Sequence, residues 1–401
     1  MELADYPESI ISEYQLLRSN PQDFNLIAPL ISKRDKSFDV HDKVVFLTQS
    51  PQLGPIVLKI DYVLDLNEYF DEIIHEAFIG LYGLNKLNSP YFAKVLGVYL
   101  SQECPEYYRK MRNDCNYVIY EYIPGPTLNE ALNTMNPTEF KQVMIQILIG
   151  LYDAYTALKF THYDLHTKNI IISRQPHKVV FKNRFLFESK FLPVIIDYGS
   201  SHIQLNGVDY GRNFYKGEIH NAEFWAHDVF KLLSMIYDRT NFNVIKAKID
   251  QNLKDALDTA PGEGYMFDYD TDQYIESLES DIESTEQEIQ DLRSSGYTEI
   301  EEEGDLEYLQ KTLAEVQKYK QDVIQYAEAE LVKANSRRYN NDKIADIVEQ
   351  LLKFFNPQFN SEQHIEYKEE HQYFELESTP KNKKLSFNDF MNYAIPILTK
   401  R

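Results

Sequence analysis

Residues 161–172 have the sequence THYDLHTKNIII, in which a polar loop leads directly into three isoleucines. The isoleucines predict a buried strand, and Asp164 and Asn169 lie in the loop that precedes it. A second apolar strand, PVIIDYG (193–199), ends on Asp197. Carboxylate and amide groups beside buried strands are destabilising unless they have partners or a function. The residues that border these two strands are therefore candidates for a functional site.

A buried cation is expected earlier in the chain. Lys59 lies within IVLKI (56–60), a predicted strand whose other residues are all aliphatic. A lysine in such a strand is destabilising unless it contacts an anion. Glu76 lies in the helix predicted over 67–87 and can supply that anion, with Glu72, one turn earlier, as the alternative.

These groups are the ones that phosphoryl transfer from ATP requires. A lysine holds the α- and β-phosphates, an acid orients that lysine, and a further carboxylate accepts or orients the proton of the acceptor hydroxyl. Carboxylate and amide oxygens are hard ligands that suit Mg²⁺, and two of them leave room for phosphate oxygens and water.

The order and spacing of these motifs resemble the protein-kinase-like superfamily over about residues 38–258 and the closing helices. IVLKI resembles the family's V-A-I-K strand, HYDLHTKN resembles H-R-D-L-x-x-x-N, and IDYG resembles D-F-G. The stretch YVIYEYIPGPTL resembles the last strand and hinge, and Asp228 in AHDVFKLL resembles an aspartate that braces the catalytic loop. The residues of these motifs, FTHYDLHTKNIII and IDYGSS, are most similar to those of kinase-like proteins of large cytoplasmic DNA viruses. The motif D-L-H-x-x-N is also shared with aminoglycoside and choline phosphotransferases.

The resemblance implies an α+β, bilobal fold with a small β-sheet N-lobe carrying one helix and a larger helical C-lobe. It also implies ATP and Mg²⁺ as cofactors. The residues to which it assigns roles are Lys59 and Glu76 at the phosphates, Glu121 to Ile123 at adenine, Asp164 as the catalytic base, and Asn169 and Asp197 as magnesium ligands.

The sequence departs from the family pattern in several places, among them Tyr198 in IDYG, which stands where the family has phenylalanine. Residues 32–53 contain no glycine where a glycine-rich loop is expected, although Lys33, Arg34 and Lys36 could supply charge there. His166 replaces the lysine that Ser/Thr kinases carry two residues after the catalytic aspartate, and Lys168 is the alternative for its role. No A-P-E follows Asp197; Glu218 is a candidate substitute for its glutamate.

The pattern predicts five segments: a helical N-terminal extension (1–37), an N-lobe (38–123), a C-lobe (124–271), an acidic insert (272–335) and closing helices (336–401). In the insert, apolar residues recur in steps of three and four, which predicts an antiparallel, coiled-coil-like helical hairpin with a turn near 294–304. The insert has 18 acidic and 5 basic residues. Such charge is typical of a solvated helix face, and an arm for a partner or a second copy is the alternative.

The whole chain has 401 residues and a net charge of −22, which argues against bulk nucleic-acid binding and favours basic protein substrates. No apolar run predicts a membrane span, and the beginning of the chain does not resemble a secretory signal. Cys104 and Cys115 are expected to be two thiols, with one bridge across a hairpin as the alternative. We expect a cytoplasmic protein, in the host cytoplasm or the virion if it is viral.

Three functions fit the sequence. The first is a protein kinase that transfers the γ-phosphate of ATP to Ser or Thr hydroxyls. It is supported by the presence together of five residues: Lys59, Glu76, Asp164, Asn169 and Asp197. The second is a pseudokinase or virion scaffold, favoured by the missing glycines and the acidic hairpin. The third is a small-molecule phosphotransferase of the aminoglycoside or choline type, favoured by D-L-H-x-x-N.

Overall fold

The computed structural model describes residues 36–40, 43–51, 53–62, 72–103, 114–211, 225–258, 271–295, 302–355 and 386–400. The chain divides into two compact units. Unit 1 consists of Met1–Tyr237 and Lys343–Arg401, and unit 2 consists of Asp238–Asp342. The predicted N-terminal extension, Lys33, Arg34 and Glu218 lie outside the described residues, except that the last two positions of the extension begin the first strand.

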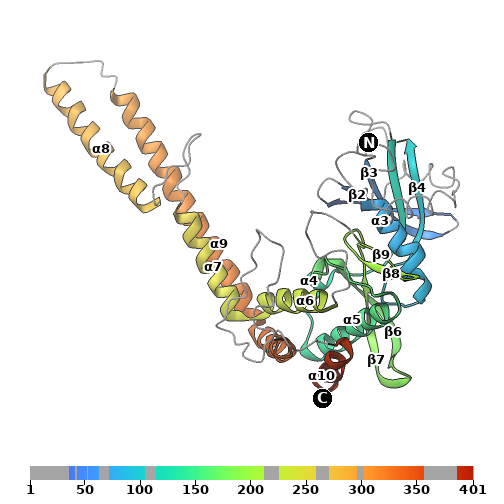
Figure 1. Ribbon diagram of the computed structural model, residues 1–401. Coiled ribbons are helices and arrows are strands. Elements are labelled where there is room, and N and C mark those ends of the chain that lie inside the picture. Colours follow the sequence, from blue (N-terminus) through green and yellow to red (C-terminus); the bar gives the residue numbers. More distant parts are fainter. Residues whose placement is uncertain are drawn as a thin grey trace. The chain divides into compact units, whose positions relative to one another are not determined.

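Unit 1 begins with a five-stranded antiparallel sheet in the order β1-β2-β3-β5-β4 (Figure 1). Its strands are β1 (Lys36–Val40), β2 (Lys43–Ser50), β3 (Gly54–Tyr62), β4 (Val95–Glu103) and β5 (Asp114–Glu121). One helix, α3 (Glu72–Phe78), contacts β3, β4 and β5. This arrangement is the small sheet lobe with one helix that the sequence predicts.

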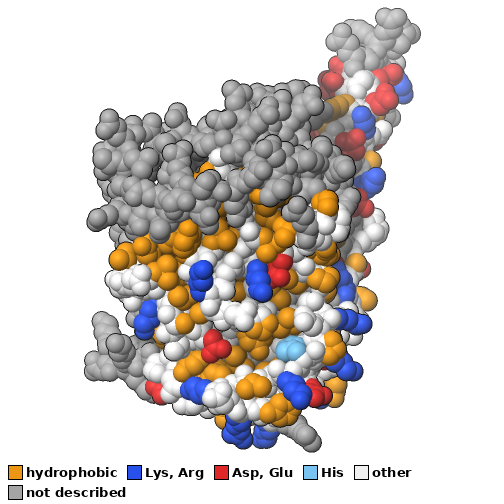
Figure 2. All heavy atoms as spheres, turned by 90° about the vertical axis from the view of Figure 1, so that its right-hand side faces the viewer, with side chains coloured by type: hydrophobic (Ala, Val, Ile, Leu, Met, Phe, Trp, Pro, Cys, Tyr) orange, Lys and Arg blue, Asp and Glu red, His pale blue; other side chains and the backbone are white. Residues whose placement is uncertain are grey.

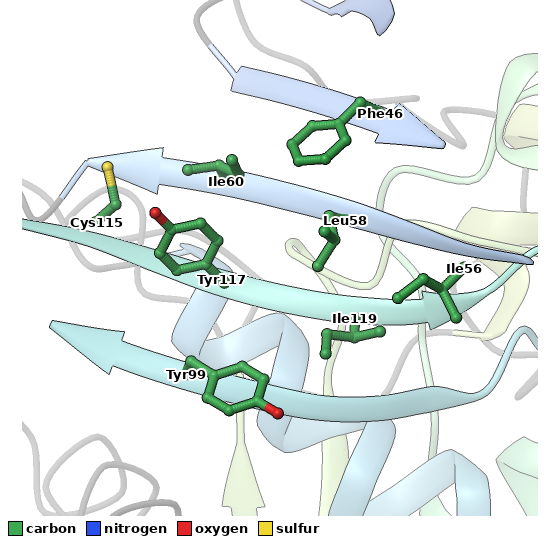
Figure 3. Packing of buried hydrophobic residues seen from close by; sticks show 8 residues of the cluster. All are labelled: Phe46, Ile56, Leu58, Ile60, Tyr99, Cys115, Tyr117 and Ile119. Atoms are coloured by element: carbon green, nitrogen blue, oxygen red, sulfur yellow. The ribbon is translucent and has the colours of Figure 1, made fainter. Parts of the chain in front are cut away.

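The sheet buries one face through alternation along its strands. Ile56, Leu58 and Ile60 of β3 pack with residues of β2, β4 and β5 in a single apolar cluster (Figure 3). Successive side chains of a strand point to opposite faces, so Lys59 points to the other face of β3. The cluster also contains Cys115, which is disulfide-bonded, so the expectation of two free thiols is wrong for this residue. The sequence's other cysteine, Cys104, lies outside the described residues.

The prediction of one regular helix over 67–87 is wrong in its second half. After α3, the chain forms a turn of π-helix (Ile79–Gly83) and then a turn of 3₁₀-helix (Leu84–Leu87). Gly80 packs so closely against the next strand that a Cβ atom would lie 2.1 Å from Val95 Cγ2. This close packing lies where the regular helix is interrupted.

The larger part of unit 1 is mainly helical. It contains α4 (Leu128–Ala131), α5 (Pro137–Leu158), α6 (Trp225–Thr240, which continues into unit 2) and α10 (Phe387–Thr399). Helix α5 begins with an Asn136 cap whose side chain accepts the Thr138 and Glu139 N–H groups. Its predicted buried stripe is confirmed, because every member is buried: Phe140, Val143, Met144, Ile147, Leu151 and Leu158.

Two strands of this part are longer than predicted. β6 (Ile170–Phe181) and β7 (Arg184–Ile195) form one antiparallel hairpin, whereas the sequence predicts only its apolar ends. The register shifts between Arg174 and His177, around Pro176, which cannot donate to the ladder. A second small hairpin, β8 (Ile203–Leu205) with β9 (Val208–Tyr210), was not predicted.

Two backbone links connect the sheet lobe to β6 and β7. The segment before β4 adds to the end of β7, because Ala93 N donates to Ile195 O (3.0 Å) and Ile195 N donates to Tyr91 O (2.8 Å). After β5, the chain lies against β6, where Ile172 N donates to Pro126 O (2.8 Å). Gly125 has φ +151°, and a Cβ atom there would lie 2.2 Å from Ile172 O, so this crossing requires a glycine.

The closing helices bury an aromatic cluster in unit 1. The rings of Trp225 and Phe387 stack at 4.5 Å between centroids, and Phe355 lies 5.3 Å from Phe390. Phe355 follows directly after α9 (Glu302–Leu352). This helix runs without a break from the predicted insert into the predicted closing helices. The predicted boundary at residue 335 therefore falls inside one helix.

Unit 2 consists of α7 (Phe242–Leu257), α8 (Thr271–Ser294) and α9 up to Asp342. α7 was not predicted. The ion pairs Arg293–Glu303 (2.6 Å) and Lys320–Asp272 show that α8 and α9 run antiparallel, as Figure 1 also shows. Four residues of the predicted apolar seam are buried: Leu278, Ile289, Val316 and Ala327.

One face of the molecule mixes charged and apolar side chains (Figure 2). On the face in Figure 2, single Lys, Arg, Asp and Glu side chains lie among hydrophobic and uncharged ones.

Among the described helices, none is both long enough and apolar enough to span a bilayer. The fold is α+β and bilobal, because unit 1 has a small sheet lobe with one helix and a larger, mainly helical lobe.

Candidate active site

Lys59, on β3, lies between two carboxylates that come from different elements. Its Nζ atom is 2.6 Å from Glu76 Oε2 on α3 and 2.8 Å from Asp197 Oδ1, two residues beyond β7. The Lys59 side chain is 8% exposed and that of Glu76 is 1% exposed, whereas that of Asp197 is 38% exposed. The cluster is therefore closed on the α3 side and open to solvent on the Asp197 side.

Burial and charge act in opposite directions on Lys59. Burial lowers the pKa of its ammonium group, but the Asp197 and Glu76 carboxylates outweigh burial and raise the pKa above its usual range. Glu76 is in turn held by the buried hydroxyl of Tyr120 on β5, which donates to Glu76 Oε1. The lysine is therefore a fixed cation in a largely dry setting. The side chain of the alternative partner, Glu72, lies outside the described side chains.

Helix α6 holds the loop 161–169 through hydrogen bonds to the loop backbone. Asp228 Oδ2 accepts the His162 N–H at 2.6 Å, and Asp228 Oδ1 accepts the Tyr163 N–H at 2.8 Å. Tyr163 has φ +61°, a left-handed conformation that non-glycine residues rarely adopt. Burial raises the pKa of Asp228 to about 7, against the opposing effect of these two N–H groups. The Asp228 carboxylate thus fixes the strained turn that presents Asp164.

His162 links this loop to the second strand. Its Nε2 lies 3.0 Å from Ile196 O, and its Nδ1 accepts the Asp164 N–H at 3.3 Å. A carbonyl needs a donor and an N–H needs an acceptor, so the ring is neutral with its hydrogen on Nε2. Burial, which is complete, lowers the pKa of His162 in agreement with this state.

Asp164 and Asn169 face each other across the loop. Asn169 Nδ2 donates to Asp164 O at 3.0 Å and lies 3.5 Å from Asp164 Oδ2. This use of the amide nitrogen turns the amide oxygen away from the loop backbone. The Asp164 carboxylate is 43% exposed, so it can reach an incoming hydroxyl.

The two strands bring Asn169 and Asp197 to the same edge. Ile170 pairs with Ile195, and Ile196 N donates to Asn169 O at 3.0 Å. Asp197 itself has φ +67°, a second left-handed residue at the site. The next residue, Tyr198, is buried, and its hydroxyl lies 2.8 Å from Ala93 O and 2.9 Å from Ile195 O. The tyrosine that replaces phenylalanine in IDYG therefore anchors this turn by hydrogen bonds.

The donor set fits Mg²⁺ held together with nucleotide phosphates. Asp197 supplies carboxylate oxygen and Asn169 supplies amide oxygen, both hard donors. Among the described residues there is no group of three or more His, Cys, Asp or Glu side chains that could hold a metal ion by themselves. A pair of protein oxygens is suited to a metal whose remaining ligands come from phosphate and water.

The predicted adenine contacts lie at the end of β5. Glu121 N donates to Lys94 O at 3.1 Å, and Glu121 Oε1 accepts the Lys94 N–H at 2.8 Å. The Glu121 N–H and side chain are therefore both engaged with Lys94, the residue before β4. A contact between Glu121 and a base would use its carbonyl group, and Ile123 follows two residues later, beyond the strand.

One site residue was missed by the sequence reasoning. Lys231 Nζ lies 2.9 Å from Asp164 Oδ1 and 3.4 Å from Tyr163 O. The signal was present, because Lys231 is three residues after Asp228 on the same helix and so lies on the same face. Of the two predicted alternatives, His166 Nε2 lies 3.7 Å from Asp164 Oδ2, and Lys168 is exposed.

No protein-family model matches the chain. In sequence it is 28% identical over 199 residues to "Probable kinase 098L" of Invertebrate iridescent virus 3, a match that covers 46% of this chain and 35% of that protein. It is 34% identical over 96 residues to the uncharacterized protein 038R of the same virus, covering 21% of this chain and 18% of that protein. The chain is related to kinase-like proteins of large DNA viruses. The matches span about a third or less of the length of these relatives.

Two solved structures give weaker similarity. The Cydia pomonella granulovirus kinase PK-1 is 18% identical with a TM-score of 0.28, over 49% of this chain and 58% of that chain. The Rad53 kinase domain and SCD2 in complex with AMPPNP is 18% identical with a TM-score of 0.27, over 43% and 52%.

Proposed function

We propose that this protein is an ATP- and Mg²⁺-dependent protein kinase that transfers the γ-phosphate to Ser or Thr hydroxyls. The observation that carries the proposal is the contact of Lys59 with both Glu76 and Asp197, at the edge shared with Asn169 and Asp164. The sequence similarity to a protein named as a probable kinase supports the same reaction class.

Each residue has a defined part in this reaction. Lys59, oriented by Glu76, binds the α- and β-phosphates; Asn169 and Asp197 hold Mg²⁺. When bound, Mg²⁺ neutralises negative charge on the phosphates. Asp164 accepts the proton of the acceptor hydroxyl as its oxygen bonds to the γ-phosphorus. The bond between that phosphorus and the bridging oxygen breaks, and ADP leaves with the electron pair.

The test is phosphate transfer from isotopically labelled ATP, read by mass spectrometry. The acceptors are the chain itself and a basic peptide library that offers Ser, Thr or Tyr. We expect label on Ser or Thr, and an Asp164→Asn variant should be slower by about 10²- to 10⁴-fold. That variant should keep nucleotide binding, since Asp164 is not proposed to hold nucleotide. Transfer by Asp164→Asn at the parental rate would contradict the assignment.

A second candidate is a pseudokinase or scaffold, favoured by the absence of glycine from residues 32–53. Backbone amides approach phosphates most closely at glycines, so their absence weakens nucleotide binding. Thermal unfolding with Mg²⁺ and ATP separates the two, because a ligand at 100 times its Kd stabilises a protein by about 2.7 kcal/mol. No stabilisation, or stabilisation without transfer, would favour the scaffold.

We propose further that the acceptor is a basic protein, since the chain has a net charge of −22. The acidic helices α8 and α9 are the candidate surface for association with a partner or a second copy. The corresponding place of action is the cytoplasm or, for a viral protein, the host cytoplasm or virion. The basic members of the peptide library should be phosphorylated faster than neutral ones at low salt.

A further inference from the structure

The contact between Lys231 and Asp164 joins α6 to the proposed base. Lys231 Nζ is 2.9 Å from Asp164 Oδ1, and the Lys231 side chain is 15% exposed while that of Asp164 is 43% exposed. Holding a lysine in one conformation with little water costs side-chain entropy and solvation. The partner of this lysine is the carboxylate on which the proposed reaction depends.

The neighbouring groups supply less positive charge to Asp164. Burial lowers the pKa of His166, an effect that Lys231 reinforces and Asp164 opposes. His166 Nδ1 accepts the Lys168 N–H at 3.2 Å, so the neutral ring carries its hydrogen on Nε2. The Lys168 side chain is exposed. Within the described residues, the ammonium group in contact with the Asp164 carboxylate is that of Lys231.

Lys231 does more than reinforce the loop backbone. Asp228, one turn earlier on α6, already binds the N–H groups of His162 and Tyr163. Lys231 adds a contact with Tyr163 O at 3.4 Å, but its shorter contact is with the carboxylate. Lys231 contacts Asp164 Oδ1. The other carboxylate oxygen, Asp164 Oδ2, faces His166 and Asn169.

We propose that Lys231 is a positioning residue for phosphoryl transfer, which holds Asp164 Oδ1 so that Oδ2 receives the acceptor hydroxyl proton. The proposal rests on the kinase function proposed above. Lys231 itself neither gains nor loses a proton: the hydroxyl oxygen bonds to the γ-phosphorus, its proton passes to Oδ2, and ADP leaves. The cation comes from α6 instead of from the loop that carries the base.

The first test is steady-state kinetics with labelled ATP and the best acceptor peptide. Lys231→Met keeps a long unbranched stem without charge, and we expect kcat to fall by about 10²-fold with KM for ATP almost unchanged. Lys231→Arg should recover part of kcat, because it restores the charge. Lys190→Met, an exposed lysine on β7, is the matched control and should keep parental kcat. If Lys231→Met does not fold, Lys231→Gln keeps a donor for Tyr163 O without the charge.

The second test needs no activity. Thermal midpoints are measured without nucleotide for the parent, Lys231→Met, Asp164→Asn and the double variant. We expect the shift of the double variant to be smaller than the sum of the two single shifts, because both single changes remove the same ion pair. Strictly additive shifts would show that the pair does not form in solution and would overturn the proposal.

The outcomes separate this proposal from the function on which it rests. If the parent transfers phosphate and Lys231→Met does so at the parental kcat, the positioning role is wrong and the kinase function stands. If Lys231→Arg is as slow as Lys231→Met, charge is not what the reaction needs and the role is also wrong. If the parent transfers no phosphate, the proposed function fails and the positioning role fails with it, even where the shifts show that the ion pair exists.

Discussion

Charged side chains behave differently in the two units of this molecule. In unit 1, Lys59 is 8% exposed and is shared by two carboxylates from distant parts of the chain. In unit 2, the ion pairs Lys246–Asp250 and Arg293–Glu303 join side chains that are about half exposed or more. Water already solvates the second kind, so each such pair contributes little. Buried charge marks the candidate site in unit 1, and exposed charge in unit 2 marks a solvated surface.

The largest expected effect comes from breaking the buried cluster. Lys59→Met leaves Glu76 and Asp197 without their shared cation, and losing one partner of a buried ion pair costs about 3–5 kcal/mol of unfolding free energy. Phosphate transfer should fall by about 10²-fold or more, because the phosphates lose a positioning group. Urea unfolding and labelled-ATP transfer measure the two effects. A variant as stable and as active as the parent would show that the buried cluster is not special.

A second prediction concerns pH and the buried ring of His162. Burial lowers the pKa of His162 in the folded protein, so the unfolded chain binds a proton at this ring more readily. Stability contributed by the neutral ring is therefore present above pH ~6.5 and is lost as the pH falls below that value. In His162→Gln this acid-side loss should be smaller, as read from unfolding free energies between pH 8 and pH 5.

The pH comparison has an internal control. Asp228, whose pKa burial raises to about 7, favours the folded state when protonated, so its contribution decreases as pH rises toward 7. This opposite effect of Asp228 is common to the parent and to His162→Gln. It therefore cancels when the unfolding free energy of one protein is subtracted from that of the other. Above pH ~8 that difference should be constant, since neither state then protonates the ring. Parallel curves down to pH 5 would contradict the assignment of a neutral ring.

The smallest effect is expected in unit 2. Arg293→Ala removes the pair with Glu303, whose side chains are 64% and 52% exposed, and should change the unfolding free energy by less than about 1 kcal/mol. The change should shrink further in 0.5 M salt because exposed charges are screened. A loss as large as that of Lys59→Met would overturn the distinction between the two units.

The sequence was most informative where charge interrupts an apolar run. Lys59 within IVLKI and Asp197 after VII were recognised because the surrounding residues leave no other explanation. Lys231 was missed because α6 is amphipathic, and a lysine on such a helix is usually a solvated residue. Its partner comes from 67 positions earlier in the chain, and that proximity depends on the fold.

The limits of the fold prediction have similar causes. The middle of β6, Ser173–Lys178, is polar and mostly exposed, so it interrupts the apolar pattern by which the beginning of that strand was recognised. The break in the helix after α3 accompanies the contact of Gly80 with Val95, a neighbour from another element. The roles assigned to all the site residues, Glu121, Ile123, His166 and Lys168 among them, stay predictions, since a nucleotide and an acceptor define them.

The backbone link between Ala93 and Ile195 constrains how the two lobes can move. This link is one connection between the lobes. The second is the chain segment that follows β5, which crosses β6 at Gly125. Helix α3 adds a third attachment, because His75 Nε2 lies 2.6 Å from Ser201 O. Any rotation of the sheet lobe against the helical lobe would therefore strain at least one of these contacts, unless its axis passed through all three.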